Sequence, residues 1–409
     1  MSSIEMAGWT VLGVGGVGLL INVARQITSG RRSRQVHQRE LEVLGERLEK
    51  VRAARNKVAA EVQSWNGSRK FRVEKKQEEK GGICSFYLTP HDGKLPLPAF
   101  DPGQFLTFQL SIGGKGVTRC YSLSDAPFPD YYRVSIKRCL PPRDKPDAPA
   151  GLASSHFHDS VNEGDILDVL APRGKFAIDP GESGPLVLSG SGVGVTPVLS
   201  MMNSLIAEKS RREIWFFYGV RNGSENMIKD EVAAWKALNL PNVHVHVCYS
   251  DPGEGEEVGA EFQHASRVEV SLFKTLLPSN NFDYYTCGPG PMMQGIRDGL
   301  AEWGVPEANV HDEAFIAVKK SVDVAAATVE FKKSEKSIEV SGSATNLLDL
   351  ANEEGVDIPS GCCAGSCGTC ETAILSGKVK YESPPEFSVE KGSCLPCVCL
   401  PEGDLALDA

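Results

Sequence analysis

The sequence lacks the excess of basic residues that binding to nucleic acid requires. Its 53 Asp and Glu residues outnumber its 43 Lys and Arg residues and give a net charge of −10, whereas a nucleic-acid-binding surface is basic. Residues 328–409 contain no arginine and carry fourteen acidic residues against six lysines. We therefore exclude a nucleic-acid partner. The acidic terminal segment indicates either plain solubility or docking to a basic protein.

The sequence also lacks any long low-complexity tract, which excludes a wholly disordered chain. Its 409 residues, 41% of them hydrophobic, are too many for one ordinary core. About two to four domains are expected for this length.

Residues 6–24 contain no charged residue. This segment is about as long as the ~20 residues that a helix needs to cross a bilayer. Four arginines follow between residues 25 and 34, whereas the only charged residue before the run is Glu5. A secretory signal peptide, which begins with positive charge, is therefore excluded. We predict a single membrane anchor at residues 1–30, with all later domains in the cytoplasm. The alternative is a buried or interfacial helix, because the run contains five glycines.

Apolar residues recur at alternating spacings of three and four between Leu41 and Trp65, interrupted at Arg55. This heptad pattern predicts one helix, and we assign residues 31–64 to a helical stalk. Its apolar seam can form a dimer contact through residues 41–65 or pack on the next domain.

The twelve cysteines are distributed unevenly, because seven of them lie in residues 362–399. A tight cluster in a large chain indicates metal ligation in a reducing compartment and not a disulfide framework. Cys362, Cys367 and Cys370 have the spacing C-x4-C-x2-C of plant-type [2Fe-2S] sites. A structural zinc site is the alternative, although zinc ligands usually form paired C-x2-C knuckles. A fourth thiolate must come from one of three later cysteines: Cys394, Cys397 or Cys399.

Three segments after residue 65 differ in pattern. Residues 65–180 contain short strand-like runs broken by Pro and Gly, which predict an antiparallel β-barrel. Residues 181–315 alternate apolar strands with helical stretches, which predicts a parallel α/β sheet. We expect a linker at residues 316–327. The last module, residues 328–409, then contains two strands and a helix capped by Ser343 or Thr345.

Arg119, Tyr121 and Ser122 lie together at the end of an expected strand in the barrel segment. An arginine can bind a phosphate, a tyrosine can lie on an isoalloxazine ring, and a serine can hydrogen-bond the reactive edge of a flavin. Gly151 and Ser154 belong to a later turn whose backbone amides can meet a pyrophosphate. With the basic segment 133–138, these residues predict a flavin site.

Gly192, Gly194, Thr196 and Pro197 lie between an expected strand and an expected helix. A glycine turn in that position places dinucleotide phosphates on helix amides. A second loop, residues 287–289, follows another strand, and the carboxyl ends of strands in such a sheet share one edge. We therefore predict that both loops build a nucleotide site at this edge.

Five phrases carry a resemblance to a known family: RCYSLSDAPFPDYYRVSIKR, VNEGDILDVLAPRGKF, GSGVGVTPVLSMM, HVCYSDPGE and YYTCGPGPMM. Through them, residues 65–315 resemble the FAD and NAD(P)H domains of the ferredoxin reductase superfamily, and in particular the reductase half of flavohaemoglobins. Residues 328–409 resemble a plant-type ferredoxin instead. No globin domain is expected, because the chain before Trp65 holds only an apolar run and one helix.

The expected fold is multidomain: an N-terminal membrane helix, an antiparallel β-barrel flavin domain, an α/β nucleotide domain with a parallel sheet, and a β-grasp (α+β) ferredoxin domain. The resemblance implies the following roles. The flavin residues are Arg119, Tyr121, Ser122, Gly151 and Ser154. The nucleotide residues are Gly192, Gly194, Thr196, Pro197, Cys287, Gly288 and Pro289. The residues around the hydride site are Ser122, Cys287, Glu313 and Phe315. The cluster ligands are Cys362, Cys367, Cys370 and, by alignment of SCLPCVCLPEGDL, Cys397.

The resemblance implies a reductase in which electrons pass from NADH or NADPH to FAD, then to [2Fe-2S], then to an external acceptor. A flavin is needed because a hydride carries two electrons and the cluster accepts one. Some relatives with this domain order hold FMN, but the flavohaemoglobin-like phrases favour FAD. Arg221 and Arg267 could each bind the 2′-phosphate of NADPH, so the residues leave the choice between NADH and NADPH open. The resemblance favours NADH.

We expect a membrane-associated oxygenase, hydroxylase or desaturase as the electron acceptor. One alternative is a membrane NADH:quinone dehydrogenase, although in those relatives the ferredoxin module precedes the flavin domain. The other is a non-enzymatic redox sensor.

Overall fold

The computed structural model describes residues 65, 67–141, 145–315, 322–365, 367–381, 385 and 387–409. All of these residues belong to one unit of the chain. The predicted membrane anchor and helical stalk lie outside the described residues. Within the described part of the chain, no helix is both long enough and apolar enough to span a membrane.

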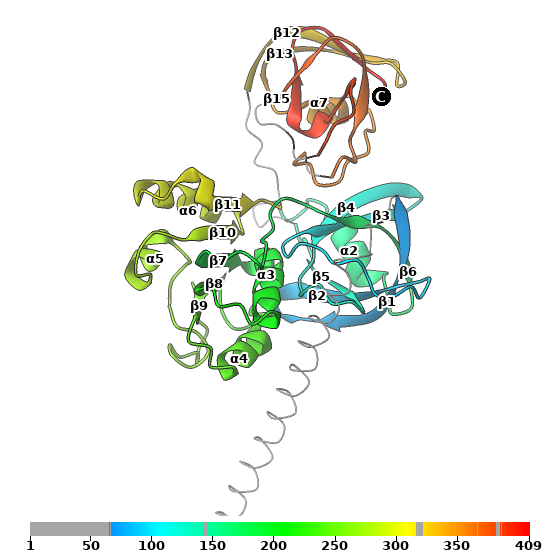
Figure 1. The fold of residues 1–409 in the computed structure, drawn as a ribbon. Helices are drawn as coiled ribbons and strands as arrows, with labels where there is room; N and C mark the ends of the chain where they lie inside the picture. Colours follow the sequence, from blue (N-terminus) through cyan, green and yellow to red (C-terminus); the bar gives the residue numbers. More distant parts are fainter. Residues whose placement is uncertain are drawn as a thin grey trace, which may run out of the picture. The chain divides into compact units, whose positions relative to one another are not determined.

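The first domain is a six-stranded antiparallel sheet with the strand order β4-β3-β6-β1-β2-β5 (Figure 1). Leu123, directly after β4, forms a bridge to Val134 in β5, which brings the two edge strands of the sheet together. The sheet therefore closes into the predicted barrel. Its strands are β1 (Ser68–Glu78), β2 (Ile83–Pro90), β3 (Phe105–Ile112), β4 (Lys115–Ser122), β5 (Tyr132–Lys137) and β6 (Ile166–Arg173), with helix α2 (Leu152–Asp159) between β5 and β6.

Apolar side chains at alternate positions of the strands form the core of this barrel. In β1, Phe71 and Val73 are buried whereas Arg72 between them is exposed, as the period of two in a strand requires. Helix α2 covers the core through Phe157, whose ring meets Phe108 edge to face at a centroid distance of 5.2 Å. This contact holds α2 against the barrel, and the predicted phosphate turn lies at the start of this helix.

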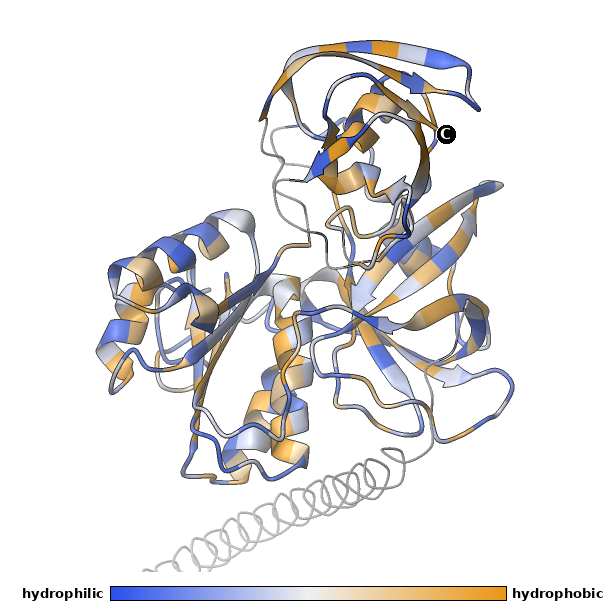
Figure 2. Cartoon of the chain, turned by 45° about the horizontal axis from the view of Figure 1, so that its top comes forward, coloured by the Kyte–Doolittle hydropathy of each residue, from blue (hydrophilic) through white to orange (hydrophobic). Residues whose placement is uncertain are grey.

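The second domain is a five-stranded parallel sheet with the order β11-β10-β7-β8-β9. Every residue of β8 is buried, as expected for a parallel strand covered on both faces. Figure 2 shows α3 as a mainly hydrophobic helix, and all of its residues except Asn203 are buried. The elements are β7 (Leu186–Ser191), α3 (Val195–Ala207), β8 (Ile214–Val220), α4 (Lys229–Ala237), β9 (Val243–Tyr249), α5 (Val270–Leu276), β10 (Asp283–Cys287), α6 (Gly290–Glu302) and β11 (Val310–Glu313).

The third domain has a mixed sheet with the order β13-β12-β18-β14-β16, a separate pair β15-β17, and one helix. Strand β18, close to the end of the chain, lies at the centre of the sheet and runs parallel to β12. The elements are β12 (Val322–Phe331), β13 (Lys336–Ala344), α7 (Leu347–Glu353), β14 (Thr372–Ser376), β15 (Val379–Tyr381), β16 (Ser393–Cys394), β17 (Cys399–Pro401) and β18 (Leu405–Leu407).

Two details of the third domain differ from the sequence prediction. The last six residues of the expected linker, 322–327, belong to β12, because Val322 begins a strand that pairs with Ala344 in β13. The cap of α7 is Asn346, whose side chain accepts a hydrogen bond from the Asp349 amide, and not Ser343 or Thr345. The Thr345 hydroxyl donates to the Asp349 carboxylate instead.

Candidate functional site

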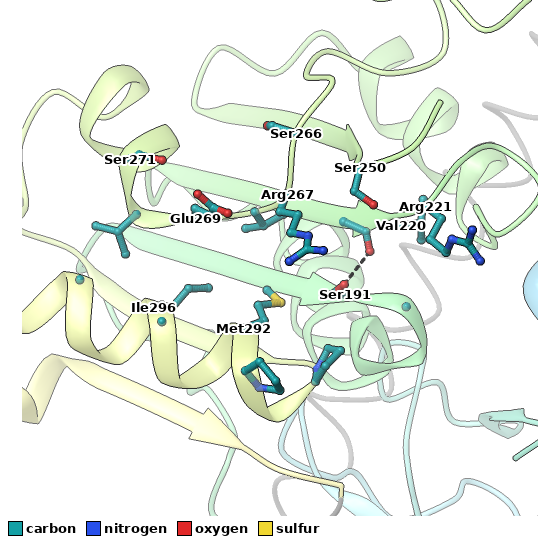
Figure 3. Close-up of a pocket in the computed structure, with 18 of the residues that line it drawn as sticks. Ser191, Val220, Arg221, Ser250, Ser266, Arg267, Glu269, Ser271, Met292 and Ile296 are labelled. Atoms are coloured by element: carbon teal, nitrogen blue, oxygen red, sulfur yellow. Dashed lines mark hydrogen bonds between the residues drawn. The ribbon is translucent and has the colours of Figure 1, made fainter. Parts of the chain in front are cut away.

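A cavity of about 790 Å³ lies where strands of the parallel sheet end. Ser191 at the end of β7, Val220 at the end of β8 and Ser250 after β9 all line it. Figure 3 shows Met292 and Ile296 of α6 facing this space. The volume falls in the range of cofactor pockets, roughly 300–1,000 Å³. Its position at the carboxyl ends of the strands is where open α/β sheets bind ligands.

Charged groups of both signs line this cavity. The cations come from Lys137, Arg221, Arg267 and Lys274, and the acids are Glu225, Glu269 and Glu302. Cations at such an edge suit the phosphates of a dinucleotide. The sequence analysis weighed Arg221 and Arg267 for the nucleotide but counted Lys137 with the flavin segment, because Lys137 lies outside the nucleotide domain at the end of β5.

The two predicted nucleotide loops lie against each other. A Cβ atom on Gly194 would be 2.6 Å from the Cys287 carbonyl oxygen and 2.8 Å from the Gly288 Cα. Gly192 lines the cavity with a φ of +55°, a conformation that favours glycine. Pro289 also lines the cavity. The expectation that both loops share one edge of the sheet is therefore confirmed.

Thr196 and Pro197 are buried in the first turn of α3. The Thr196 hydroxyl donates to the Val193 carbonyl over 3.0 Å and so closes the glycine turn on the helix. Helix α3 has 13 residues and directs its first amides toward this turn, which suits a nucleotide phosphate. Both residues shape the turn.

Cys287 and Glu313 end two neighbouring parallel strands and are paired in register. Cys287 is fully buried. Burial, and then the charges of Glu313 and Asp312, raise the pKa of the Cys287 thiol well above its usual range. The thiol is therefore neutral. Phe315 follows β11 with 44% of its surface exposed, so its ring is available to a bound group.

The flavin motif occupies the end of β4. Tyr121 packs its ring against Phe157 at a centroid distance of 5.2 Å, and burial raises the pKa of its hydroxyl to about 12. Ser122 is buried, whereas Arg119 is exposed and donates to the Thr118 carbonyl. An exposed arginine in this strand remains available to a phosphate.

The start of α2 offers a site that fits the phosphates of a flavin dinucleotide. The Ser154 hydroxyl accepts from the Cys139 amide and donates to the Gly151 carbonyl, which fixes the turn. Ser155 Oγ is buried and has no hydrogen-bond partner among the described residues. A buried hydroxyl without a partner is uncommon in native proteins, and this one suits a hydrogen bond to a phosphate oxygen. From the sequence, flavin roles were assigned to Gly151 and Ser154 of this turn but not to the neighbouring Ser155, because a serine in a helix carries no signal of its own.

Arg133 does not belong to the flavin site, although the sequence analysis counted it with the basic segment 133–138. Its side chain is 7% exposed and lies near Asp125 and Glu231. Arg138, in the same segment, pairs with Asp159 at the surface. The two arginines are therefore held by carboxylates of the chain.

The four predicted cluster cysteines lie in two pairs. The Cys362 amide is 3.3 Å from the Cys367 sulfur, and the Cys367 amide is 3.3 Å from the Cys362 sulfur. The Cys370 and Cys397 sulfurs are 3.2 Å apart. Within the described residues, no group of three or more metal-binding side chains surrounds a single point. Two pairs fit a [2Fe-2S] cluster, in which two protein ligands serve each iron, better than a tetrahedral zinc ion.

These three sites define a class of protein: an iron–sulfur flavoprotein with a nicotinamide nucleotide site. Three family models match it in the same order. The oxidoreductase FAD-binding domain matches residues 70–178, the oxidoreductase NAD-binding domain residues 188–298, and the 2Fe-2S iron-sulfur cluster binding domain residues 329–402.

Curated relatives share the first two domains. The flavohemoprotein of Halalkalibacterium halodurans is 39% identical over 253 residues, which are 61% of this chain and 60% of that protein. The flavohemoprotein of Bordetella pertussis is 37% identical over 254 residues, 61% of each chain. The chain thus spans about 60% of the length of the curated relatives it matches.

Solved structures extend the comparison. The flavohem-like FAD/NAD-binding domain of nitric oxide dioxygenase from Vibrio cholerae is 30% identical, with a TM-score of 0.53, over 61% of this chain and 99% of that domain. Phthalate dioxygenase reductase is 27% identical, with a TM-score of 0.54, over 84% of this chain and 98% of that protein. The chain belongs to the ferredoxin reductase superfamily and joins FAD-binding and NAD-binding domains to a 2Fe-2S domain.

Proposed function

We propose that the chain is the reductase component of an oxygenase, hydroxylase or desaturase system. Electrons pass from NAD(P)H to FAD, then to [2Fe-2S], then to the partner. The observation that carries this proposal is the presence of all three domains in a chain that covers 98% of phthalate dioxygenase reductase, which is described as transferring electrons from pyridine nucleotides to [2Fe-2S].

The residues of the chain have separate tasks in this reaction. The turn at Gly192 and Gly194 binds nucleotide phosphates through the first amides of α3. Ser122 and Cys287, both buried, exclude water from the hydride site, and the neutral Cys287 thiol adds no charge there. Bound FAD supplies the conversion of one two-electron transfer into two one-electron transfers. The paired cysteines then hold the one-electron acceptor.

We further propose that NADH is the preferred nucleotide. Arg221, at the cavity, lies 3.4 Å from the Asp251 carboxylate. That carboxylate offsets the charge that would attract the 2′-phosphate of NADPH and repels the phosphate itself. Arg267 remains at the cavity as the residue that would favour NADPH.

Anaerobic titration of the purified protein with NADH and with NADPH tests both proposals. We expect loss of flavin absorbance followed by the EPR signal of a reduced [2Fe-2S] cluster, at lower concentrations of NADH than of NADPH. A protein without flavin absorbance, or a cluster that stays oxidised, would overturn the reductase function. Steady turnover of ferricyanide would exclude a non-enzymatic sensor.

We also propose that residues 6–24 anchor the chain in a membrane with the catalytic domains in the cytoplasm. The support is the charge-free run and the four arginines after it. Deletion of residues 1–30 should move the protein from the membrane fraction to the soluble fraction while NADH–ferricyanide turnover continues. A full-length chain found in the soluble fraction would contradict the anchor.

A further inference from the structure

We propose that a buried polar network centred on Asp125 and Arg133 is the positioning device that holds the nicotinamide at hydride-transfer distance from the flavin. The inference rests on the proposed function. In the step concerned, a hydride leaves NADH with both electrons of the broken C–H bond and reduces the flavin, so NADH is oxidised. Apart from Arg133, which the sequence analysis counted with the basic segment of the flavin site, no residue of the network was given a role from the sequence.

The network begins close to both cofactor motifs along the chain. Asp125 comes three residues after Ser122, at the end of the flavin strand β4. Ser200 and Asn203 lie on α3, the helix that begins at the nucleotide turn. A contact between Asp125 and α3 therefore joins the two motifs through a few residues of ordered chain.

Two hydrogen bonds make this contact, and a third supports it. The Ser200 hydroxyl donates to the Asp125 carbonyl over 2.7 Å, and the Asn203 amide donates to the Asp125 carboxylate over 2.9 Å. The Trp235 indole donates to the Asn203 amide oxygen over 3.2 Å. Trp235 therefore orients the Asn203 side chain so that its NH2 group faces Asp125.

Arg133 adds a second link between the barrel and the nucleotide domain. Its Nη1 atom is 3.4 Å from Glu231 on α4, and its Nε atom is 3.6 Å from Asp125. Nε also donates to the Ser124 hydroxyl over 3.2 Å, and Nη2 donates to the Ser124 carbonyl. The guanidinium is thus held at four points and cannot shift without losing its two charge pairs.

The chemistry of the network suits positioning better than stability. A buried ion pair contributes little stability compared with apolar groups of the same volume, because desolvation of the charges offsets their attraction. Directional bonds, unlike apolar contacts, resist sliding of one surface over another. Hydride transfer requires such rigidity, since a displacement of about 1 Å can lower the rate about 100-fold.

The test uses stopped-flow reduction of the flavin by NADH and by NADH deuterated at the transferred hydride, on the full-length protein loaded with FAD. The variants are Arg133→Met and Asn203→Leu, which nearly preserve side-chain volume, with Arg133→Lys as a rescue. Glu231→Gln and Glu261→Gln form a matched pair: Glu231 faces Arg133 of the barrel, whereas Glu261 pairs with Lys229 inside the nucleotide domain.

We expect Arg133→Met and Asn203→Leu to lower the saturating rate of flavin reduction about 10- to 100-fold. The NADH dissociation constant should change less than about threefold, with a full isotope effect and unchanged flavin content. Arg133→Lys should recover part of this rate. Glu231→Gln should lower the rate more than Glu261→Gln does. If Arg133→Met fails to hold flavin, Asn203→Leu decides the outcome.

Wild-type rates in both main variants would overturn the inference, as would a loss of NADH affinity that accounts for the lower rate. Failure of the wild-type flavin to accept electrons from NADH or NADPH would instead overturn the proposed function. The two failures are therefore distinguishable in one experiment.

Discussion

Gly194 lies so close to Cys287 that a Cβ atom on Gly194 would be 2.6 Å from the Cys287 carbonyl oxygen. The Gly194 backbone has a φ of −62°, which any residue can adopt. Proximity, and not conformation, therefore requires glycine at this position. The contact sets the distance between the loop after β7 and the loop after β10.

Gly194→Ala should separate these two loops. We expect the free energy of unfolding to fall by about 1–3 kcal/mol, as in other overpacked sites, and the NADH dissociation constant to rise. Thermal unfolding and NADH titration measure the two effects. Gly116→Ala is the control, because a Cβ atom there meets nothing within 4 Å. Equal behaviour of the two variants would show that the loops tolerate separation.

Ser155→Ala should have opposite effects with and without flavin. Its hydroxyl is buried without a partner among the described residues, so its removal should stabilise the flavin-free protein by about 1–3 kcal/mol. If the hydroxyl binds FAD, the same change should weaken FAD binding. Thermal unfolding of both forms, with FAD titration, measures this. Unchanged FAD affinity would remove Ser155 from the flavin site.

Cys397→Ala should abolish the [2Fe-2S] cluster, because the Cys397 sulfur lies 3.2 Å from that of Cys370. Iron content and the EPR signal of the reduced protein measure the loss, while flavin content should remain. Cys399→Ala is the matched control, since Cys399 is also buried but lies beside Cys394. A cluster lost in Cys399→Ala and kept in Cys397→Ala would reverse the assignment of the fourth ligand.

His246 should make the nucleotide domain less stable in acid. Burial, and then the neighbouring His264 and His244, lower the pKa of His246 from 6.5 to about 4. Between these values the unfolded chain binds a proton that the folded chain does not, so stability falls as the pH falls from about 6.5 to 4. We expect a loss of about 1–2 kcal/mol at pH 5, after allowance for solvent screening.

His246→Phe keeps the ring stacked on Phe217, 5.2 Å away in the native protein, and removes the titrating group. The difference in thermal unfolding between pH 7 and pH 5 should therefore be smaller in His246→Phe than in the wild type. The exposed His91 offers His91→Gln as a control. An unchanged difference in His246→Phe would assign the acid sensitivity to other groups.

Local patterns were enough to predict the barrel, the parallel sheet and the two nucleotide loops. Gly192 follows one expected strand and Gly288 follows another, and the carboxyl ends of parallel strands must share an edge. Arg133 shows the limit of this reasoning, because its side chain could face a phosphate or a carboxylate until Asp125 and Glu231 are placed around it. Only the tertiary structure decides such a choice.

The predicted cap of α7 was wrong because of a small shift in the start of the helix. Thr345 and Asn346 are both good capping residues, and the start of the helix at Leu347 selects Asn346. Boundaries of this kind shift by one or two residues without any change in the apolar pattern. The predicted start of strand β12 was also too late, because the run of alanines before Thr328 resembles a linker.

Strand β18 makes the sheet of the cluster domain depend on residues that follow all of its cysteines in the sequence. Because Leu405–Leu407 form the central strand between β12 and β14, the sheet cannot close until these residues have been made. A chain interrupted before Leu405 would retain the flavin and nucleotide segments but no framework around its cysteines. Such a fragment would keep its hydride-accepting segments without a one-electron outlet, so loading of the cluster reports whether β18 has been made.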